Sequence, residues 1–299
     1  MKEDLQLQLP DGRRIGYCEY GAPDGQPLFF FHGWPSSRYH GMMLHQAAAK
    51  RGWRVIAPDR PGIGLSDPLP GRGFAAFPKD IAGLADGLGI EKFRLFGISG
   101  GGPYTLATAA ALPERVQAAA VLCGAPPFGG PEERANMHWA YRILAGLKPL
   151  RRAIMPVVLG ASRWMIGRGS HRIPMSWVMR SIPASDRAAI AENACWVDVS
   201  RSYLEAARSG SAAVLEDGEL YLEPWDFAPE DIRVPVGFWH GLEDRNLPFE
   251  VAQRLAARVP GATGHWIVGE GHYSLPLRFR DQVLDWLEDP DRDPDWDPD

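Results

Sequence analysis

The sequence predicts an α/β protein, with a mostly parallel eight-stranded sheet that is flanked by helices and interrupted by a helical insertion. Short apolar runs, such as residues 27–31 and 116–122, lack polar alternation, which is typical of strands buried on both faces. Helical stretches separate these runs and are long enough to connect parallel strands. Between about residues 128 and 229 the alternation of strands and helices stops, and afterwards it resumes.

The elements of the core can be placed in order along the chain. Leucines alternate with polar residues before a turn at Asp11 and Gly12, so residues 4–20 are expected to form a β-hairpin. The other strands are expected at residues 27–31, 53–57, 93–96, 116–122, 234–239 and 264–268. The core helices are expected at about residues 38–51, 77–88, 104–112, 249–258 and 276–288.

The insertion and the C-terminus differ in character from this core. We expect residues 1–127 and 230–288 to form the core and residues 128–229 to form the helical insertion. Residues 289–299 are acidic and rich in proline, which predicts a disordered tail. Helices of the insertion are expected at about residues 132–146, 150–167, 174–180, 184–194 and 196–208.

Composition excludes several classes of protein. The 299 residues carry a net charge of −5, so there is no basic field to attract nucleic acid. The three cysteines are widely spaced and form no CxxC or Cys/His cluster, so no disulfide framework, metal site or cofactor is indicated. The N-terminus lacks a signal-peptide pattern, and no apolar run reaches the roughly 20 residues of a membrane span. These features favour a cytoplasmic location.

One turn carries the pattern of a chemical site. Gly97-Ile98-Ser99-Gly100-Gly101 lies between an expected strand and an expected helix, which fits the G-x-S-x-G nucleophile elbow. A serine at such a turn needs a strained backbone, and side chains at the flanking glycines would collide with the neighbouring strand and helix. The unpaired N–H groups of the following helix favour negative charge beside Ser99.

Two further groups follow later strands at the same edge of the predicted sheet. Asp244 and His272 come after the strands at residues 234–239 and 264–268, and ligands of open α/β sheets bind at the carboxyl ends of strands. Ser99 needs a base to accept its proton, and His272 can be that base because the unperturbed pKa of a histidine lies near neutrality. Asp244 would hold the imidazole and stabilise its charged form.

Other polar residues near these positions are expected to have different roles. Glu243 neighbours Asp244 and could be the acid instead. His265 is expected at the start of its strand, at the opposite edge from the site. The remaining candidates are expected to be packed, structural or at the surface, and they are His32, Ser66, Cys123, Asp217, Asp226, Asp231 and His240.

These residues together resemble the α/β-hydrolase superfamily, in its serine esterase and lipase-like branch. The order serine, acid, histidine is the one found in that superfamily. The resemblance covers nearly the whole chain except the insertion. It rests on residues 32–35 (HGWP), 59–67 (DRPGIGLSD), 97–101 (GISGG), 240–244 (HGLED) and 271–272 (GH).

The resemblance implies further roles for this chain. It makes residues 128–229 a helical cap over the site, and it favours Asp244 over Glu243 as the acid. It places an oxyanion hole at the backbone N–H groups of Trp34 and Gly100. Aromatic and apolar residues are expected to line the substrate pocket, namely Trp34, Met137, Trp139, Tyr141, Trp164, Trp177 and Tyr273.

The expected activity is hydrolysis of carboxylic esters of small to medium apolar substrates through an acyl-enzyme, without metal or cofactor, by a monomer or homodimer. Serine at the elbow argues against dehalogenases and epoxide hydrolases, which resemble this fold but use aspartate there. Gly100 replaces the tryptophan of proline iminopeptidase-like enzymes and the methionine of many haloperoxidases and C–C hydrolases. Lactonases, aminopeptidases, C–C hydrolases and a ligand-binding signalling protein on the same scaffold stay open as alternatives.

Overall fold

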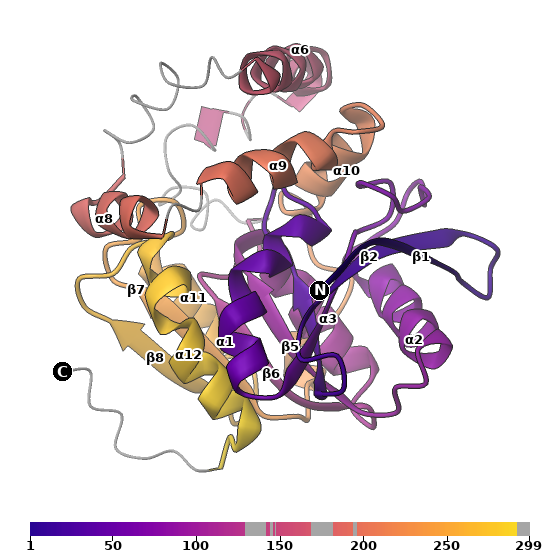
Figure 1. The fold of residues 1–299 in the computed structure, drawn as a ribbon. Helices are drawn as coiled ribbons and strands as arrows, with labels where there is room; N and C mark the ends of the chain where they lie inside the picture. The colour runs from indigo at the N-terminus through magenta and orange to yellow at the C-terminus, as the bar shows by residue number, and fades with distance from the viewer. Residues whose placement is uncertain (129–141, 144–145, 147, 169–181, 194–195, 292–299) are drawn as a thin grey trace.

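The fold is built on one eight-stranded sheet, seen near the centre of Figure 1. The computed structural model describes residues 1–128, 142–143, 146, 148–168, 182–193 and 196–291. The strands are β1 (Lys2–Gln8), β2 (Arg14–Gly21), β3 (Gln26–Phe31), β4 (Trp53–Pro58), β5 (Phe93–Ile98), β6 (Val116–Leu122), β7 (Val236–Gly241) and β8 (Thr263–Ile267). Each lies within two residues of its expected position.

The strand order explains why polar groups far apart in sequence can meet. The sheet runs β1-β2-β4-β3-β5-β6-β7-β8. β2 is antiparallel to both its neighbours, and the six strands from β4 to β8 are parallel. The carboxyl ends of β3, β5, β6, β7 and β8 therefore meet at one edge. The arrangement confirms the predicted α/β-hydrolase fold class.

Helices cover both faces of the sheet. The helical elements of the core are η1 (Arg38–Leu44), α1 (His45–Lys50), η2 (Phe74–Ala76), α2 (Phe77–Gly87), η3 (Ser99–Gly101), α3 (Gly102–Ala111), η4 (Pro229–Asp231), α11 (Phe249–Ala256) and α12 (Ser274–Glu288). Side chains of α2, α3 and α11 pack on one face, and those of α1 and α12 pack on the other. In β3, Phe29 and Phe31 enter the first core while Leu28 and Phe30 enter the second, which is why this strand is apolar throughout.

Helices also make up the described part of the insertion between β6 and β7. They are α6 (Lys148–Gly167), α8 (Ala184–Glu192), α9 (Trp196–Ala206) and α10 (Ala212–Leu220), and Figure 1 shows them at the end of the sheet where the parallel strands finish. The sequence does not predict α10, because Gly218 and the acidic residues Glu216, Asp217 and Glu219 interrupt any apolar periodicity. Most of the helix expected at residues 132–146, all of the helix expected at residues 174–180 and most of the expected tail lie outside the described residues.

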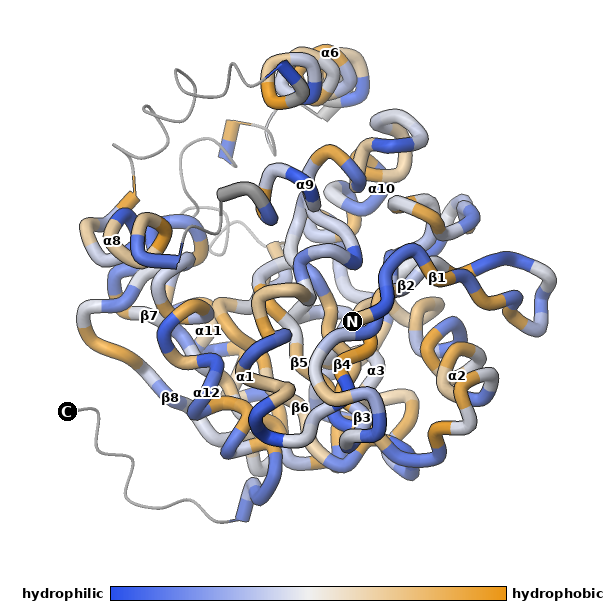
Figure 2. The backbone as a smooth tube through the Cα atoms, in the orientation of Figure 1, coloured by the Kyte–Doolittle hydropathy of each residue, from blue (hydrophilic) through white to orange (hydrophobic). Residues whose placement is uncertain are grey.

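Hydrophobic segments gather in the sheet and in the helix faces that contact it, as the orange regions of Figure 2 show. Among the described helices, none is long and apolar enough to cross a membrane.

Candidate active site

Ser99 sits at a sharp turn between β5 and α3. Its φ of 53° lies in the left-handed region, which costs a non-glycine residue about 1–3 kcal/mol. A Cβ at Gly97 would collide with the Thr105 hydroxyl, and one at Gly101 would collide with the Phe31 carbonyl. The glycines are therefore needed for close packing, and the turn holds the half-buried Ser99 at the edge of the sheet.

The three residues predicted from the strand ends form one hydrogen-bonded chain. His272 Nε2 lies 3.0 Å from Ser99 Oγ, and His272 Nδ1 lies 2.7 Å from Asp244 Oδ2. The other carboxylate oxygen of Asp244 accepts the backbone N–H groups of Asn246 and Leu247 at 2.8 and 2.9 Å. The carboxylate is thus fixed on both sides, and the imidazole is held with one nitrogen facing Ser99.

Charges around His272 favour its protonated form. Burial lowers the pKa of His272, but the charge and hydrogen bond of Asp244 and the charge of Asp186 raise it, so that the net direction is upward. Burial raises the pKa of Asp244, but the charge and hydrogen bond of His272 outweigh it and leave that pKa below its ordinary value. Asp244 therefore stays ionised beside an imidazole that can take up a proton.

Asp186 on α8 is a site residue that the sequence did not indicate. Its buried carboxylate accepts three consecutive backbone N–H groups, those of His272 at 3.2 Å, Tyr273 at 2.9 Å and Ser274 at 2.8 Å. It thus ties the insertion to the loop that carries His272 and satisfies N–H groups at the start of α12. No local pattern links residues 86 positions apart, so only the tertiary structure reveals this contact.

The loop after β3 lies against the elbow. A Cβ added to Gly33 would lie 3.9 Å from Ser99 Oγ, and a Cβ added to Gly100 would lie 3.0 Å from the backbone nitrogen of Trp34. The buried guanidinium of Arg60 donates to the carbonyls of His32 and Gly33, both at 2.8 Å. Because the N–H and C=O of a trans peptide point in opposite directions, the Trp34 N–H points away from Arg60. Arg60 therefore fixes the orientation of that peptide.

A buried ion network holds Arg60 in place. Asp217 on α10 pairs with Arg60 at 2.9 Å and with Arg72 at 2.8 Å, and it also accepts a hydrogen bond from the Tyr104 hydroxyl. All four side chains are buried. The expectation that Asp217 lies at the surface is wrong, because the two arginines compensate its charge inside the protein.

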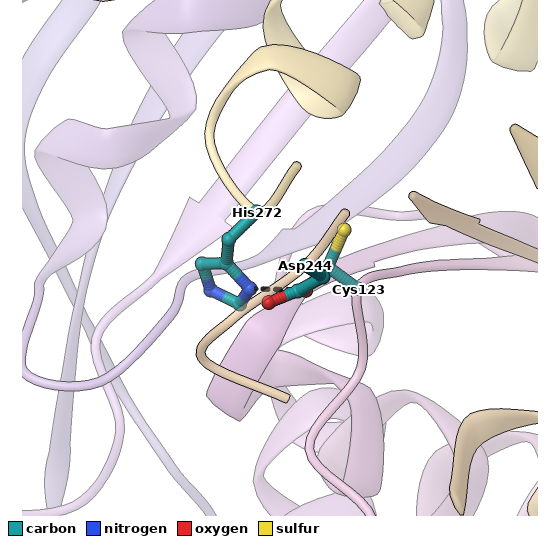
Figure 3. Close-up of side chains that lie close together, drawn as sticks. All are labelled: Cys123, Asp244 and His272. Carbon is teal, nitrogen blue, oxygen red and sulfur yellow. Dashed lines mark hydrogen bonds and ion pairs between the residues drawn. The ribbon is translucent and has the colours of Figure 1, made fainter. Parts of the chain in front are cut away.

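Cys123 lies beside the carboxylate of Asp244, as Figure 3 shows. Within the described residues, Cys123, Asp244 and His272 are the group of side chains whose donor atoms lie close enough to hold a metal ion, within 4.8 Å of one another. Both oxygens of Asp244 already accept hydrogen bonds, and burial raises the pKa of the Cys123 thiol well above its ordinary value. The donor set therefore fits a protonated thiol packed against the acid better than a metal ligand.

The described residues also form a largely apolar pocket that opens on Ser99. Besides Ser99, Gly100 and His272, its walls come mostly from the insertion and from loops of the core. They are Trp34, Ala125, Phe128, Met155, Leu215, Gly218, Glu219, Tyr221, Leu222, Asn246 and Leu247. The hydroxyl of Tyr221 donates to the Gly100 carbonyl at 2.8 Å, so this wall is attached to the elbow.

The structure separates the predicted pocket residues into three groups. Trp34 lines the pocket and its indole nitrogen donates to the Val214 carbonyl at 2.8 Å. Trp164 does not line it, because this position of α6 faces outward and leaves the side chain 57% exposed. Tyr273 packs edge-on against the ring of His272 but is not part of the lining. Met137, Trp139, Tyr141 and Trp177 lie outside the described residues.

The competing polar residues have other surroundings. Glu243 is exposed, whereas Asp244 is buried. His240 Nε2 donates to the Leu247 carbonyl at 2.8 Å, and His265 stacks on Trp239 within the core. His32 and Ser66 are both buried and bonded to backbone groups of their own loops.

Comparisons with known proteins agree with this architecture. Residues 26–147 match the family described as "alpha/beta hydrolase fold". The chain is 38% identical to a non-heme chloroperoxidase of Streptomyces lividans over 121 residues, which is 39% of this chain and 43% of that protein. It is 27% identical to a bifunctional esterase/perhydrolase of Acinetobacter calcoaceticus over 256 residues, covering 83% of this chain and 85% of that protein.

Solved structures resemble the fold over almost the whole chain. An esterase from Rhodococcus matches with a TM-score of 0.68 and 20% identity, covering 96% of this chain and 99% of that one. An enol-lactonase from Burkholderia xenovorans matches with a TM-score of 0.67 and 18% identity, covering 95% and 100%. The family match over residues 26–147, the strand order and these likenesses show that the chain has the alpha/beta hydrolase fold.

Proposed function

We propose that this protein is a serine hydrolase that cleaves carboxylic esters through an acyl-enzyme intermediate. The observation that carries the proposal is the hydrogen-bonded chain from Ser99 through His272 to Asp244, which opens into an apolar pocket. A serine, an imidazole and a carboxylate in this order satisfy the demands of nucleophile, base and orienting acid. The likeness to a bifunctional esterase/perhydrolase supports the same reaction class.

In the first half-reaction, Ser99 Oγ attacks the ester carbonyl carbon while His272 Nε2 accepts the hydroxyl proton. The N–H groups of Trp34 and Gly100 stabilise the charge that develops on the carbonyl oxygen. The bond to the alcohol then breaks, and His272 returns its proton to the leaving oxygen. In the second half-reaction, water loses a proton to His272 and attacks the acyl group, and the acid leaves as Ser99 regains its proton.

The pocket walls support small to medium apolar acyl or alcohol groups as substrates. Met155, Leu215 and Leu222 come from the insertion, so we propose that residues 128–229 act as a cap over the site. Trp34 both lines the pocket and is the proposed oxyanion donor, so an acyl group bound against it would place its carbonyl near that N–H.

A ligand-binding protein without turnover is the main alternative. A fluorophosphonate probe and a panel of p-nitrophenyl acetate, butyrate and lactone substrates distinguish the two. We expect one probe molecule per chain, located on Ser99 by mass spectrometry, and saturable ester hydrolysis that the probe abolishes. Tight binding of an ester with no measurable turnover, or labelling spread over several serines, would contradict the proposed activity. The same panel of esters, assayed with hydrogen peroxide added, tests whether Ser99 also supports perhydrolysis.

Asp186 is expected to act as a positioning residue for His272. Replacing Asp186 by asparagine removes a negative charge that raises the pKa of His272. It also places the amide N–H group of the new side chain against backbone N–H donors of the His272 loop. We expect kcat to fall by about tenfold or more, with a smaller change in KM. The acidic limb of the pH–rate profile should shift to lower pH, because His272 would then lose its proton, and become an active base, at a lower pH.

The matched control for this variant is Asp198→Asn, since Asp198 is an exposed acid on the neighbouring helix α9. It should leave both kcat and the pH profile unchanged. If Asp186→Asn lowers the melting temperature but leaves the acidic limb in place, Asp186 has a structural role only.

A further inference from the structure

We propose that the outer face of α6 docks on an anionic lipid surface. The docking surface is defined by five side chains of this helix, which have exposed fractions of 36–69%. They are Leu150 at 54%, Ile154 at 36%, Val157 at 69%, Val158 at 50% and Trp164 at 57%. This inference concerns an interaction surface and does not depend on the proposed ester hydrolysis.

The spacing places these side chains on one side of the helix. Residues 150, 154, 157, 158 and 164 follow steps of three, four or seven, which bring side chains to a common face. The opposite face carries Met155 and Leu159, which are buried against Ile63 and Val214. The helix is therefore apolar both inside and outside.

A helix that is apolar on both faces normally lies in a protein core or at a membrane. Here Figure 1 shows α6 at the periphery of the molecule, far from the sheet, and Figure 2 shows apolar segments along it. Scattered single apolar residues need no explanation, but five exposed on one helix face are an arrangement that marks an interaction site.

The charge of the segment indicates which partner covers this patch. The whole chain has a net charge of −5, yet the sequence contains no Asp or Glu between residues 134 and 180. Between residues 142 and 168 the sequence contains six basic residues, and they are Arg142, Lys148, Arg151, Arg152, Arg163 and Arg168. Clustered basic residues beside an apolar helix face and a tryptophan are typical of helices that lie in the interface of an anionic bilayer.

The contacts of these arginines fit that placement. The guanidinium of Arg168 lies 4.4 Å from the ring centre of Trp164, so a charged group and an aromatic ring share the outer edge of the helix. Arg152 lies on the opposite side of the helix, in step with Met155 and Leu159, and pairs there with Glu219 at 2.8 Å. Arg168 can therefore reach phosphate groups while the apolar face enters the acyl boundary.

The same charge disfavours a second copy of the chain as the partner. A two-fold dimer through α6 would bring the patch against itself, and with it the basic residues of both helices. Like charges brought together across an interface repel one another and weaken the complex, whereas an anionic surface would attract the basic residues. The docking also places lipid next to the pocket, because Met155 on the inner side of α6 lines it.

Flotation with lipid vesicles tests the proposal. We expect the full chain to float with vesicles of phosphatidylcholine containing about 30% phosphatidylglycerol and to stay behind with pure phosphatidylcholine. Raising the salt concentration from about 0.05 M to about 0.5 M should release most of the bound protein, because salt screens the attraction. Binding that is equal for both lipid compositions, or indifferent to salt, would overturn the proposal.

Matched variants locate the contact on α6. Val157→Glu should lower the partition onto anionic vesicles by about tenfold, whereas Val268→Glu, the same change at an 80% exposed position after β8, should not. Arg168→Gln should lower it about fivefold, and Arg254→Gln on α11 should not. Circular dichroism confirms that each variant is folded, and hydrolysis of a soluble ester by Val157→Glu should match that of the wild type.

Self-association is the competing outcome. If sedimentation shows a dimer that Val157→Glu converts to a monomer, and vesicles bind neither protein, then a second copy covers the patch and the lipid proposal is wrong. If Val157→Glu and Val268→Glu bind anionic vesicles equally well, the contact lies elsewhere on the protein.

Discussion

Ser99→Ala is expected to lower kcat for p-nitrophenyl butyrate hydrolysis by about 10⁴- to 10⁶-fold while leaving KM within a few-fold of the wild type. The Ser99 hydroxyl is the group at the elbow that would form the bond to the acyl carbon, and alanine lacks it. His272 Nε2, which lies 3.0 Å from Ser99 Oγ, then has no hydroxyl proton to accept. The proposed oxyanion donors, the N–H groups of Trp34 and Gly100, are backbone groups and survive the substitution, so a small residual rate is expected.

The measurement needs controls for folding and for contaminating esterases. Ser209→Ala, at an exposed serine outside the site, should retain wild-type kcat and should be purified in the same way. The double variant Ser99→Ala/Asp244→Asn should be no slower than Ser99→Ala alone, because groups that act as one unit do not contribute additively. A Ser99→Ala protein that keeps more than about 1% of the wild-type kcat would rule out the acyl-enzyme route.

The sheet and the hydrogen-bonded group of Ser99, His272 and Asp244 could be predicted from the sequence for a physical reason. Parallel strands buried on both faces must be apolar throughout, so their ends are visible as abrupt changes to polar or glycine residues. The carboxyl ends of such strands meet at one edge, which predicts that polar groups directly after them lie together. The structure brings the three side chains to hydrogen-bond distance at that edge.

The contacts between the insertion and the core could not be predicted from the sequence. Asp186 and Asp217 each lie among polar residues on short helices, where an acidic residue is ordinarily solvated. Their partners are backbone N–H groups of the His272 loop in one case and two buried arginines in the other. No spacing encodes such pairings. Trp164 shows the converse, since an aromatic residue expected in the pocket lies on the outer face of α6.

Both acids connect the insertion to segments that carry proposed catalytic groups. Asp186 holds the loop of His272, and Asp217 holds Arg60, which orients the peptide between Gly33 and Trp34. The proposed base and one proposed oxyanion donor are therefore each positioned through a carboxylate of the inserted helices. It follows that substitutions in the insertion can change kcat without touching substrate.

Asp217→Asn is expected to lower the free energy of unfolding by about 3–5 kcal/mol. The variant keeps the shape of the side chain but leaves Arg60 and Arg72 buried without a countercharge. Burial raises the pKa of Asp217, but the charges of the two arginines outweigh it and lower that pKa overall. The ionised form therefore stabilises the fold above the ordinary pKa of an aspartate, and this contribution is lost only as the pH falls through the lower folded-state value.

Urea denaturation at neutral pH measures this loss, with Glu230→Gln as the matched control. Glu230 also pairs with an arginine, Arg258 at 2.7 Å, but that pair is exposed, so its removal should leave the unfolding free energy unchanged. If Asp217→Asn is as stable as the control, the network does not hold the core together. If it is folded but its kcat falls with KM unchanged, Asp217 acts through Arg60 on the Trp34 N–H, because that donor is needed only in the transition state.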